Sequence, residues 1–302
     1  MNCLVTGGAG FIGSNLALEL EKQGNEVTVV DNFLTGNKDN LKGFNGKFVK
    51  ADVSDNNFNI DGQFDVIFHE AAITDPRHPD DKETYNKNLQ GFKNMIELAK
   101  KNNAKLIYAS TASLYGNGQT PMKEDQEKEL LSAYGKSKLE MDNIASKLFD
   151  KMHIVGLRYF NVFGPREKYK NRAASMIYHL GKQIKAGKNP RIFKSGEQKR
   201  DNIYVKDVVD ATITAVNAKS GVYNVGTGVD ADFNELVKVL NEVLGKNFEP
   251  EYFDMPYDPK TYQSNTQADT TKAENVLGFK AKWALKEGIK DYFGWLDENG
   301  WE

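Results

Sequence analysis

Residues 2–14 constrain the fold more strongly than any other stretch of the chain. A short apolar run over residues 2–6 leads into Gly7, Gly10 and Gly13, and a helical pattern of apolar residues follows as far as Lys22. Glycines at this spacing, between a strand and a helix, permit a sharp turn and a close approach of the backbone to a pyrophosphate. The helix would direct free N–H groups at the phosphates. The pattern therefore predicts a dinucleotide-binding unit.

Asp31 ends the next apolar run, residues 27–30. A carboxylate at this point can accept hydrogen bonds from both hydroxyls of an adenosine ribose, and it would repel a 2′-phosphate. We therefore expect NAD as the cofactor, with NADP as the alternative. Asp52 and Val53 follow a third short strand, predicted over residues 47–51, and would suit the adenine. A simple strand-end turn explains these two residues equally well.

Composition narrows the class of protein. The chain has 302 residues, of which 39% are hydrophobic, so it can bury the core of one large domain or of one and a half. The net charge of −2 does not favour binding to nucleic acid or to a membrane surface. Cys3 is the only cysteine, and the first apolar run leads directly into the glycine turn. We expect a cytoplasmic protein without a disulfide, a membrane span or a metal site.

Strand-like and helix-like patterns alternate along the first two thirds of the chain. Further strands are expected at 64–68, 105–109, 155–159 and 221–226, and helices at 81–102, 132–150 and 206–219. This alternation predicts an α/β fold, a Rossmann-type doubly wound parallel sheet of about seven strands. Shorter elements suggest a smaller C-terminal substrate-binding domain, with helices at 173–185, 233–244, 270–277 and 285–296 and a strand at 251–253. We assign residues 1–164 and 201–230 to NAD binding, and residues 165–200 and 231–302 to substrate binding.

Small and polar residues follow the fourth predicted strand. Ala71 and Ala72 would let the cofactor lie against the backbone there. His69, at the strand end, is expected to be a structural hydrogen-bonding residue rather than a base. Asn88, on the next helix, lies where it could contact the cofactor or a neighbouring loop.

The fifth strand and the helix after it carry candidate catalytic groups. Ser110 and Thr111 place hydroxyls at the carboxyl end of the strand, where open α/β sheets bind ligands. Tyr134 and Lys138 are four residues apart and therefore project from one face of a helix. A nearby ammonium stabilises a phenolate and brings a tyrosine into the range of a working base. The same ammonium could donate to the nicotinamide ribose.

Three ordered motifs resemble the extended short-chain dehydrogenases/reductases and, more narrowly, the NAD-dependent nucleotide-sugar epimerase/dehydratase family. They are Thr6-Gly-Gly-Ala-Gly-Phe-Ile-Gly13, Tyr134-Gly-Lys-Ser-Lys138 and Arg158-Tyr-Phe-Asn-Val-Phe-Gly-Pro165. The resemblance implies that Thr111 steadies the substrate oxygen, that Tyr134 is the acid/base and that Lys138 is its partner. It also implies a nucleotide-sugar substrate, a homodimer or higher homo-oligomer, and further cofactor contacts from Phe11, Ile12, Asn32 and Val162.

The two residues after Thr111 help to distinguish between the reactions of this family. Dehydratases of this family usually carry an Asp-Glu pair there, whereas this chain has Ala112-Ser113. Dehydration is therefore disfavoured, and no glucuronate-recognising site for a decarboxylase is identified. Epimerisation remains: a carbinol carbon is oxidised, and hydride returns to the opposite face of the ketone. The class of protein is then an isomerase.

Two epimerase branches resemble different parts of the chain. The loop at 31–36 is similar to UDP-hexose 4-epimerases, whereas the second half resembles the ADP-glycero-manno-heptose 6-epimerase branch, in which a lysine at the position of Lys170 is a second acid/base. That resemblance implies substrate contacts from Asn161, His179, Phe193, Arg200 and Tyr262, beside Ser110. The chain departs from this branch in its ribose loop, since the branch favours NADP, in a shorter stretch at 193–199, and in Asn171-Arg172.

A non-catalytic NAD-binding sensor is the alternative from another class. Members of this fold that lose their chemistry usually lose the tyrosine or the lysine of the helix. Tyr134 and Lys138 are both present, which favours the enzyme.

Overall fold

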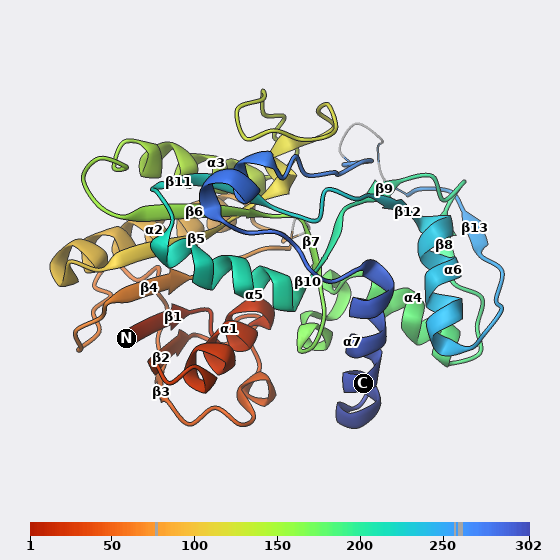
Figure 1. Cartoon of the computed structure of the whole chain (residues 1–302), viewed down its shortest axis with the longest axis horizontal. Helices are drawn as coiled ribbons and strands as arrows, with labels where there is room; N and C mark the ends of the chain where they lie inside the picture. The colour runs from red at the N-terminus through yellow and green to blue at the C-terminus, as the bar shows by residue number, and fades with distance from the viewer. Residues whose placement is uncertain (76–77, 257, 259–261) are drawn as a thin grey trace.

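A seven-stranded parallel sheet lies at the centre of the computed structural model, which describes residues 1–75, 78–256, 258 and 262–302 (Figure 1). The strand order is β11-β6-β5-β4-β1-β2-β3, so the chain winds in one direction from β1 to β3 and in the other from β4 to β11. The predicted Rossmann-type sheet is confirmed. Its strands are β1 (Asn2–Thr6), β2 (Glu26–Asp31), β3 (Lys47–Lys50), β4 (Val66–His69), β5 (Lys105–Thr111), β6 (Ile154–Tyr159) and β11 (Gly221–Val225).

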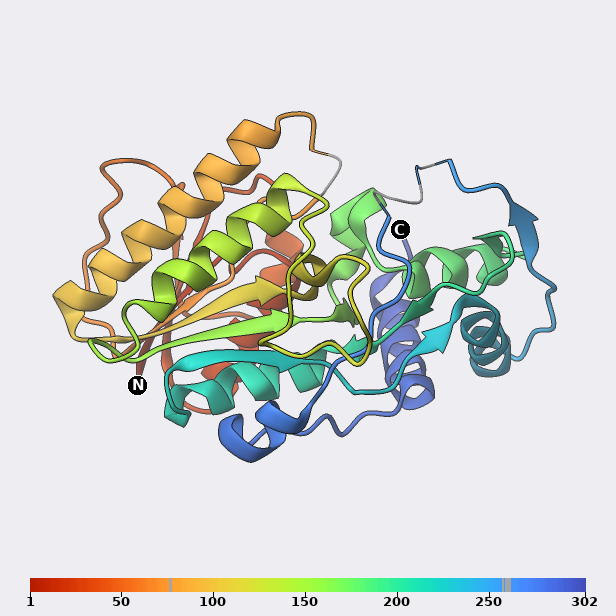
Figure 2. The same cartoon turned by 90° about the horizontal axis from the view of Figure 1, so that it is seen from above.

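Helices cover both faces of this sheet (Figure 2). On one face lie α2 (Asp81–Asn102) and α3 (Ala133–Ser146), and on the other lie α1 (Phe11–Lys22) and α5 (Val205–Thr214). Successive side chains of a strand point to opposite faces. Accordingly Leu4 of β1 packs in the core beneath α2 and α3, whereas Cys3 and Val5 pack in the core beneath α1 and α5. Burial on both faces explains why central strands such as β1 and β4 are continuous apolar runs.

A second, smaller core lies beyond the carboxyl end of the sheet, on the right in Figure 1. Three helices pack around it with Phe163 and Tyr204: α4 (Met176–Lys185), α6 (Phe233–Leu244) and α7 (Leu285–Asn299). Three pairs of short strands form separate two-stranded sheets outside the main sheet. They are β7 (Asn161–Phe163) with β10 (Asn202–Tyr204), β9 (Lys199–Arg200) with β12 (Ala231–Asp232), and β8 (Arg191–Phe193) with β13 (Glu251–Phe253).

Several predicted boundaries were wrong, mostly where a cap or a change of helix type ends an element. The helix predicted from residue 173 begins at Met176, because the Ser175 hydroxyl caps it by accepting from the Tyr178 N–H. The helix predicted through residue 219 ends at Thr214 and continues as a 3₁₀ turn. The helix predicted near 270–277 is a single π-helical turn, η6 (Ala273–Leu277). The other short helices in the described part of the chain are η1 (Lys38–Leu41), η2 (Ala112–Tyr115), η3 (Glu167–Ala173) and η4 (Ala215–Asn217).

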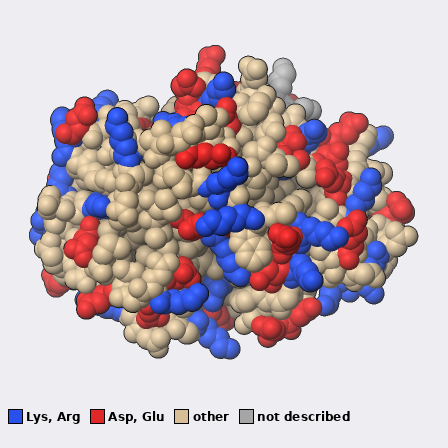
Figure 3. Space-filling model, viewed as in Figure 1, with Lys and Arg blue, Asp and Glu red and all other residues tan. Residues whose placement is uncertain are grey.

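Charges of both signs are interspersed on the face drawn in Figure 3. Many surface lysines pair with acidic neighbours, for example Lys282 with Asp210 at 2.6 Å and Lys286 with Glu242 at 2.8 Å. Among the described residues, no helix combines the length and the apolar character that crossing a membrane requires.

Candidate active site

One cavity of about 560 Å³ opens at the carboxyl ends of the central strands and extends to the smaller core. A second cavity of about 70 Å³ adjoins it and shares Gly7, Asp31, Ala71 and Ala72. Predicted site residues from both halves of the chain line the larger cavity: Gly7, Gly10, Phe11, Ile12, Gly13, Asp31, Ala71, Ala72, Ser110, Thr111, Tyr134, Lys138, Asn161, Val162, Lys170, Arg200 and Tyr262. The topology therefore brings together residues that are more than 200 positions apart.

Two glycines of the turn, Gly7 and Gly13, leave no room for a side chain. Gly7 has a φ of +66°, and a Cβ on it would lie 2.7 Å from the Ala71 nitrogen. A Cβ on Gly13 would lie 2.3 Å from the Gly7 carbonyl oxygen, because the first turn of α1 packs directly on the loop. Gly10 is the N-cap and has no side chain to occupy the first N–H groups of α1. The helix N-terminus is thus presented to the cavity as an anion site.

Asp31 is fixed at the edge of the cavity by backbone donors. Its carboxylate accepts from the Ala9 N–H at 3.0 Å and from the Phe33 N–H at 2.7 Å. Burial raises the pKa of Asp31, and these two hydrogen bonds oppose the rise. A Cβ on Gly36 would lie 2.8 Å from the Asp31 Oδ1, so the loop closes tightly over the carboxylate.

The smaller cavity is lined by four residues that were predicted to bind the cofactor: Asn32, Asp52, Val53 and Asn88. Burial alone would raise the pKa of Asp52, but hydrogen bonds from Ser54 and Asn32 and the charge of Lys87 together lower it. The Asn88 amide donates to the Ile73 carbonyl at 3.0 Å and accepts from the Ile73 N–H at 2.8 Å.

Asn88 was expected to contact either the cofactor or a neighbouring loop, and the structure contains the loop contact. The amide also donates to the Ser137 hydroxyl of α3 at 3.1 Å. Asn88 thereby ties the loop after β4 to the helix that carries Tyr134 and Lys138.

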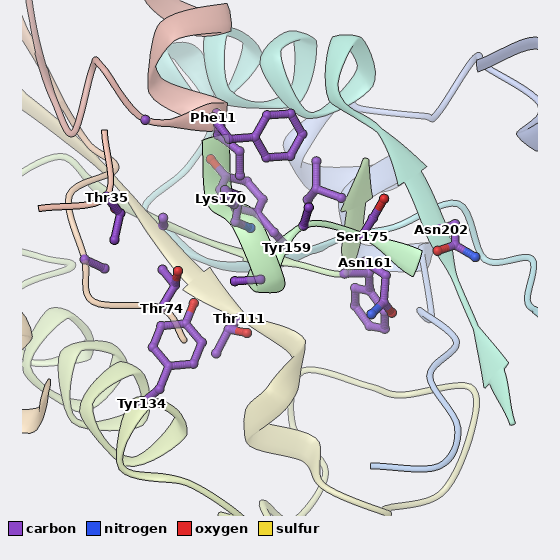
Figure 4. A pocket seen from close by; sticks show the side chains of 18 of the residues that line it. Phe11, Thr35, Thr74, Thr111, Tyr134, Tyr159, Asn161, Lys170, Ser175 and Asn202 are labelled. Atoms are coloured by element: carbon purple, nitrogen blue, oxygen red, sulfur yellow. The ribbon is translucent and has the colours of Figure 1, made fainter. Parts of the chain in front are cut away.

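Tyr134 and Lys138 lie in the wall of the larger cavity, with Thr111 beside the tyrosine (Figure 4). Ser132 caps α3 by accepting from the Gly135 N–H at 3.1 Å, which puts Tyr134 in the first turn. Burial raises the pKa of Tyr134 to about 12, and a hydrogen bond with Thr111 opposes the rise. Burial lowers the pKa of Lys138 to about 8, although the charges of Glu70 and Asp142 act to raise it.

A hydrogen bond to the central sheet fixes the position of Lys138. The Lys138 ammonium donates to the Ala109 carbonyl of β5 at 2.7 Å. An ammonium has three N–H donors, so this bond leaves two others for the site. Together with the glycine cradle and the Asp31 carboxylate, these donors fit a nicotinamide dinucleotide laid across the strand ends.

His69 and Glu70 point to opposite sides of the sheet. His69 contacts the Thr6 hydroxyl at 2.8 Å, and burial lowers its pKa to about 3, so the ring is neutral and structural as expected. Glu70 lines the cavity and accepts from the Tyr159 hydroxyl at 2.9 Å. Burial raises the pKa of Glu70 to about 7. Glu70 was not predicted as a site residue, although a charged residue directly after a buried strand was a visible signal.

Lys170 lies across the cavity from Tyr134, near Phe11 of the glycine turn (Figure 4). Its ammonium lies 5.5 Å from the centroid of the Phe11 ring, a cation–π distance. Burial lowers the pKa of Lys170, while the charges of Glu167 and Asp75 act to raise it. A buried lysine whose pKa is lowered gives up its proton more readily than an exposed one.

Polar groups also line the part of the cavity nearest the smaller core. Ser110 lines the cavity, and its buried hydroxyl has no hydrogen-bond partner within the described ranges. Asn161 accepts from the Thr266 hydroxyl at 2.7 Å through its side-chain oxygen, which leaves its amide N–H groups.

Arg200 makes contacts within the chain that the sequence did not suggest. Its guanidinium donates to the carbonyls of Ser264 at 2.6 Å and Gln263 at 2.5 Å. Its central carbon lies 5.3 Å from the centroid of the Tyr262 ring. Arg200 therefore holds the 262–264 segment as well as facing the cavity.

Two predicted substrate residues, His179 and Phe193, are not among the residues that line either cavity in the described part of the chain. The His179 ring lies 5.5 Å from the Tyr178 ring on α4, and the Phe193 ring lies 5.8 Å from the Tyr262 ring. Phe193 therefore packs against Tyr262, which lines the larger cavity. Lining residues that the sequence analysis did not identify include Thr35, Thr74, Ser175, Asn202, Phe233 and Leu236.

Known proteins resemble this chain over nearly its whole length. Residues 3–226 match the family model described as the NAD dependent epimerase/dehydratase family. An ADP-L-glycero-D-manno-heptose-6-epimerase of Brachyspira hyodysenteriae is 36% identical, with 98% of each chain covered. The crystal structure of the Helicobacter pylori ADP-L-glycero-D-manno-heptose-6-epimerase has a TM-score of 0.90 and 37% identity, covering 97% of this chain and 95% of that one. A Thermotoga maritima UDP-glucose 4-epimerase, solved with UDP-glucose, has a TM-score of 0.89 and 30% identity, covering 99% of both chains.

Proposed function

The chain belongs to the NAD-dependent epimerase/dehydratase family and is a nucleotide-sugar epimerase, and we propose that it inverts the exocyclic carbon of an ADP-glycero-manno-heptose. Two relatives named as heptose 6-epimerases are 36% and 37% identical to it, against 30% for the UDP-glucose 4-epimerase. The observation that carries the proposal is the position of Lys170 across the cavity from Tyr134 (Figure 4). Inversion of a centre requires chemistry on both faces of a ketone, and two proton-exchanging groups on opposite walls meet that need.

Under this proposal the chain's own residues act as follows. The bound dinucleotide supplies hydride acceptance from the carbinol carbon and hydride return to the opposite face. Thr111 orients the substrate oxygen, and Tyr134 removes the proton of the hydroxyl in one direction and restores it in the other. The Lys138 ammonium stabilises the phenolate of Tyr134, which lowers the cost of deprotonating a buried phenol. Lys170 exchanges the proton when the opposite face of the ketone is presented.

We propose NAD rather than NADP as the physiological cofactor. The Asp31 carboxylate is held at the ribose end of the cavity by the N–H groups of Ala9 and Phe33. Its remaining acceptor sites suit the ribose hydroxyls, and its charge disfavours a 2′-phosphate. This loop is also the feature that favours the alternative function, a UDP-hexose 4-epimerase.

We further propose that residues 1–164 and 201–230 bind the dinucleotide, and that residues 165–200 and 231–302 bind the nucleotide sugar. The smaller core around α4, α6 and α7 is separate from the cores on the two faces of the sheet, which supports this division. Substrate contacts are assigned to Ser110, Asn161, Arg200 and Tyr262, which line the cavity. We also propose that the chain works in the cytoplasm, as expected from its single cysteine, and as a homodimer or higher homo-oligomer, as the family resemblance implied.

The test is proton NMR of the purified protein with separate nucleotide sugars. Interconversion of the two ADP-glycero-manno-heptose epimers supports the proposal, whereas conversion of UDP-glucose to UDP-galactose supports the alternative. Failure to convert the heptose under conditions in which another nucleotide sugar turns over would refute the heptose assignment.

Lys170→Met then tests the second base. Loss of one positioned acid/base group is expected to lower kcat by about 10²- to 10⁴-fold, since the opposite face loses its proton donor. Lys199→Met is the matched control, because Lys199 is exposed and pairs only loosely with Asp230 at 3.8 Å. An enzyme that uses only Tyr134 would keep its kcat in both variants.

A further inference from the structure

Glu70 is a carboxyl group in the cavity wall that the proposed mechanism does not use. It follows β4 directly and faces away from His69, toward the side of the sheet covered by α5. Its Oε1 accepts from the Tyr159 hydroxyl of β6 at 2.9 Å. Burying a carboxyl group costs free energy of folding unless the group is hydrogen-bonded or neutralised. The surroundings of Glu70 should therefore show how that cost is offset.

The hydrogen-bond chain behind Glu70 can run in two directions. The Tyr159 hydroxyl lies 2.8 Å from the Thr212 hydroxyl, which in turn lies 2.7 Å from the Val208 carbonyl on α5. If Glu70 is protonated, each group donates to the next one and the chain ends on the carbonyl. If Glu70 is ionised, Tyr159 donates to it and Thr212 can donate to Tyr159. Since each hydroxyl has one proton and can also accept, both states are satisfied without movement of heavy atoms.

The charge of Glu70 acts on the catalytic pair. Within the described part of the chain, the titratable groups that interact with it are Lys138 and Tyr134 from α3 and Tyr159 from β6. Thr212, the contact from α5, does not titrate. An ionised Glu70 raises the pKa of Lys138 and of Tyr134, so it keeps the ammonium charged and makes the phenol harder to deprotonate.

We propose that Glu70 is a positioning residue for the epimerase reaction, whose carboxyl group exchanges a proton with water and so sets the charge balance of Tyr134 and Lys138. The geometry that carries this is a carboxyl group in the cavity wall, backed by a reversible hydrogen-bond chain and adjacent to the catalytic pair. The raised pKa of Glu70, about 7, means that the carboxyl group changes its charge near neutral pH. The inference rests on the roles proposed for Tyr134 and Lys138.

The first test does not depend on catalysis. Infrared difference spectra of the wild type during a pH titration should contain a protonated-carboxyl band that is lost through neutral pH and is missing in Glu70→Gln. Tyr159→Phe removes the hydrogen bond that lowers the pKa of Glu70, so the midpoint of that band should move to higher pH. A wild-type spectrum without such a band, or a midpoint that Tyr159→Phe leaves in place, would overturn the proposal whatever the activity.

The second test is the pH profile of kcat/KM. Glu70→Gln removes a negative charge, so each limb of the profile that reports the titration of Tyr134 or Lys138 should move to lower pH by about one unit. Glu70→Asp, which keeps the charge, should move the limbs less. Unchanged limbs in a folded Glu70→Gln protein would refute the coupling and leave the proposed function intact. Retained turnover in Tyr134→Phe would instead refute the proposed function, without altering the infrared result.

Discussion

Replacement of Gly13 by alanine tests the packing of the dinucleotide-binding turn. The new Cβ would lie 2.3 Å from the Gly7 carbonyl oxygen, 2.8 Å from the Gly7 carbonyl carbon and 2.9 Å from the Gly8 Cα. All three atoms belong to the backbone, so no side chain can turn aside. Overpacking typically costs about 1–3 kcal/mol, and we expect the upper part of that range. The helix preference of alanine returns at most about 1 kcal/mol, leaving a net loss of about 2 kcal/mol.

Gly294→Ala is the matched control, because Gly294 lies inside α7 and a Cβ on it would meet no atom within 4 Å. There only the helix preference changes, and the protein should gain about 1 kcal/mol. In thermal unfolding followed by fluorescence, the Tm should fall by about 4–8 °C for Gly13→Ala and rise by about 2–4 °C for Gly294→Ala.

The same substitution should weaken binding of the cofactor. The N–H groups of the turn would be displaced from the phosphates, and losing one hydrogen bond to a charged group lowers affinity by about tenfold or more. Titration calorimetry with NAD measures this change. Equal Tm values for Gly13→Ala and Gly294→Ala, or wild-type NAD affinity in Gly13→Ala, would show that the turn is not close-packed as described.

Three other substitutions give separate expectations. Tyr134→Phe should abolish turnover in the NMR assay while calorimetry still detects NAD, because the phenol acts in proton transfer; measurable turnover would exclude it as the base. Asp31→Ser should lower NAD affinity by about tenfold and raise NADP affinity, since an acceptor and a repelling charge are lost together; parallel losses of both cofactors would contradict this. The pKa of Glu70 is about 7 in the folded chain against 4.5 as a free side chain, so its contribution to stability is complete below pH 4.5 and is lost as the pH rises to 7. Glu70→Gln should therefore raise the Tm relative to wild type at pH 8, by an amount corresponding to about 3 kcal/mol, and much less at pH 4.5.

Elements with a strong local signal could be predicted from the sequence. The helix from Phe11 to Lys22 was predicted to the residue, because the glycine turn defines its start and Gly24 follows its end. The helix Asp81–Asn102 was predicted equally well, since the Asp80 side chain caps it and Asn103 leaves it in a left-handed conformation. These signals involve neighbours in the chain, and no tertiary contact is needed to interpret them.

The site could be predicted in part, for a topological reason. Thr111, Tyr134 and Lys138 meet Asp31 in one cavity, because parallel strands deliver their carboxyl ends to the same edge of a sheet. Residues in the second half were less predictable: Arg200 faces the cavity, whereas His179 does not line it. The orientation of such residues depends on how α4, α6 and α7 pack around the smaller core, which no local pattern specifies.

The sequence by itself determined the strand–turn–helix unit, the alternation that makes the parallel sheet, and the residue types of the catalytic helix. Only the tertiary structure decided that Glu70 faces Tyr159 and the catalytic pair, that Lys170 lies opposite Tyr134, and that Asn88 holds a loop. The physical reason is that secondary structure follows from short-range periodicity and capping, whereas protonation and proximity depend on burial and on charges brought close by distant parts of the chain.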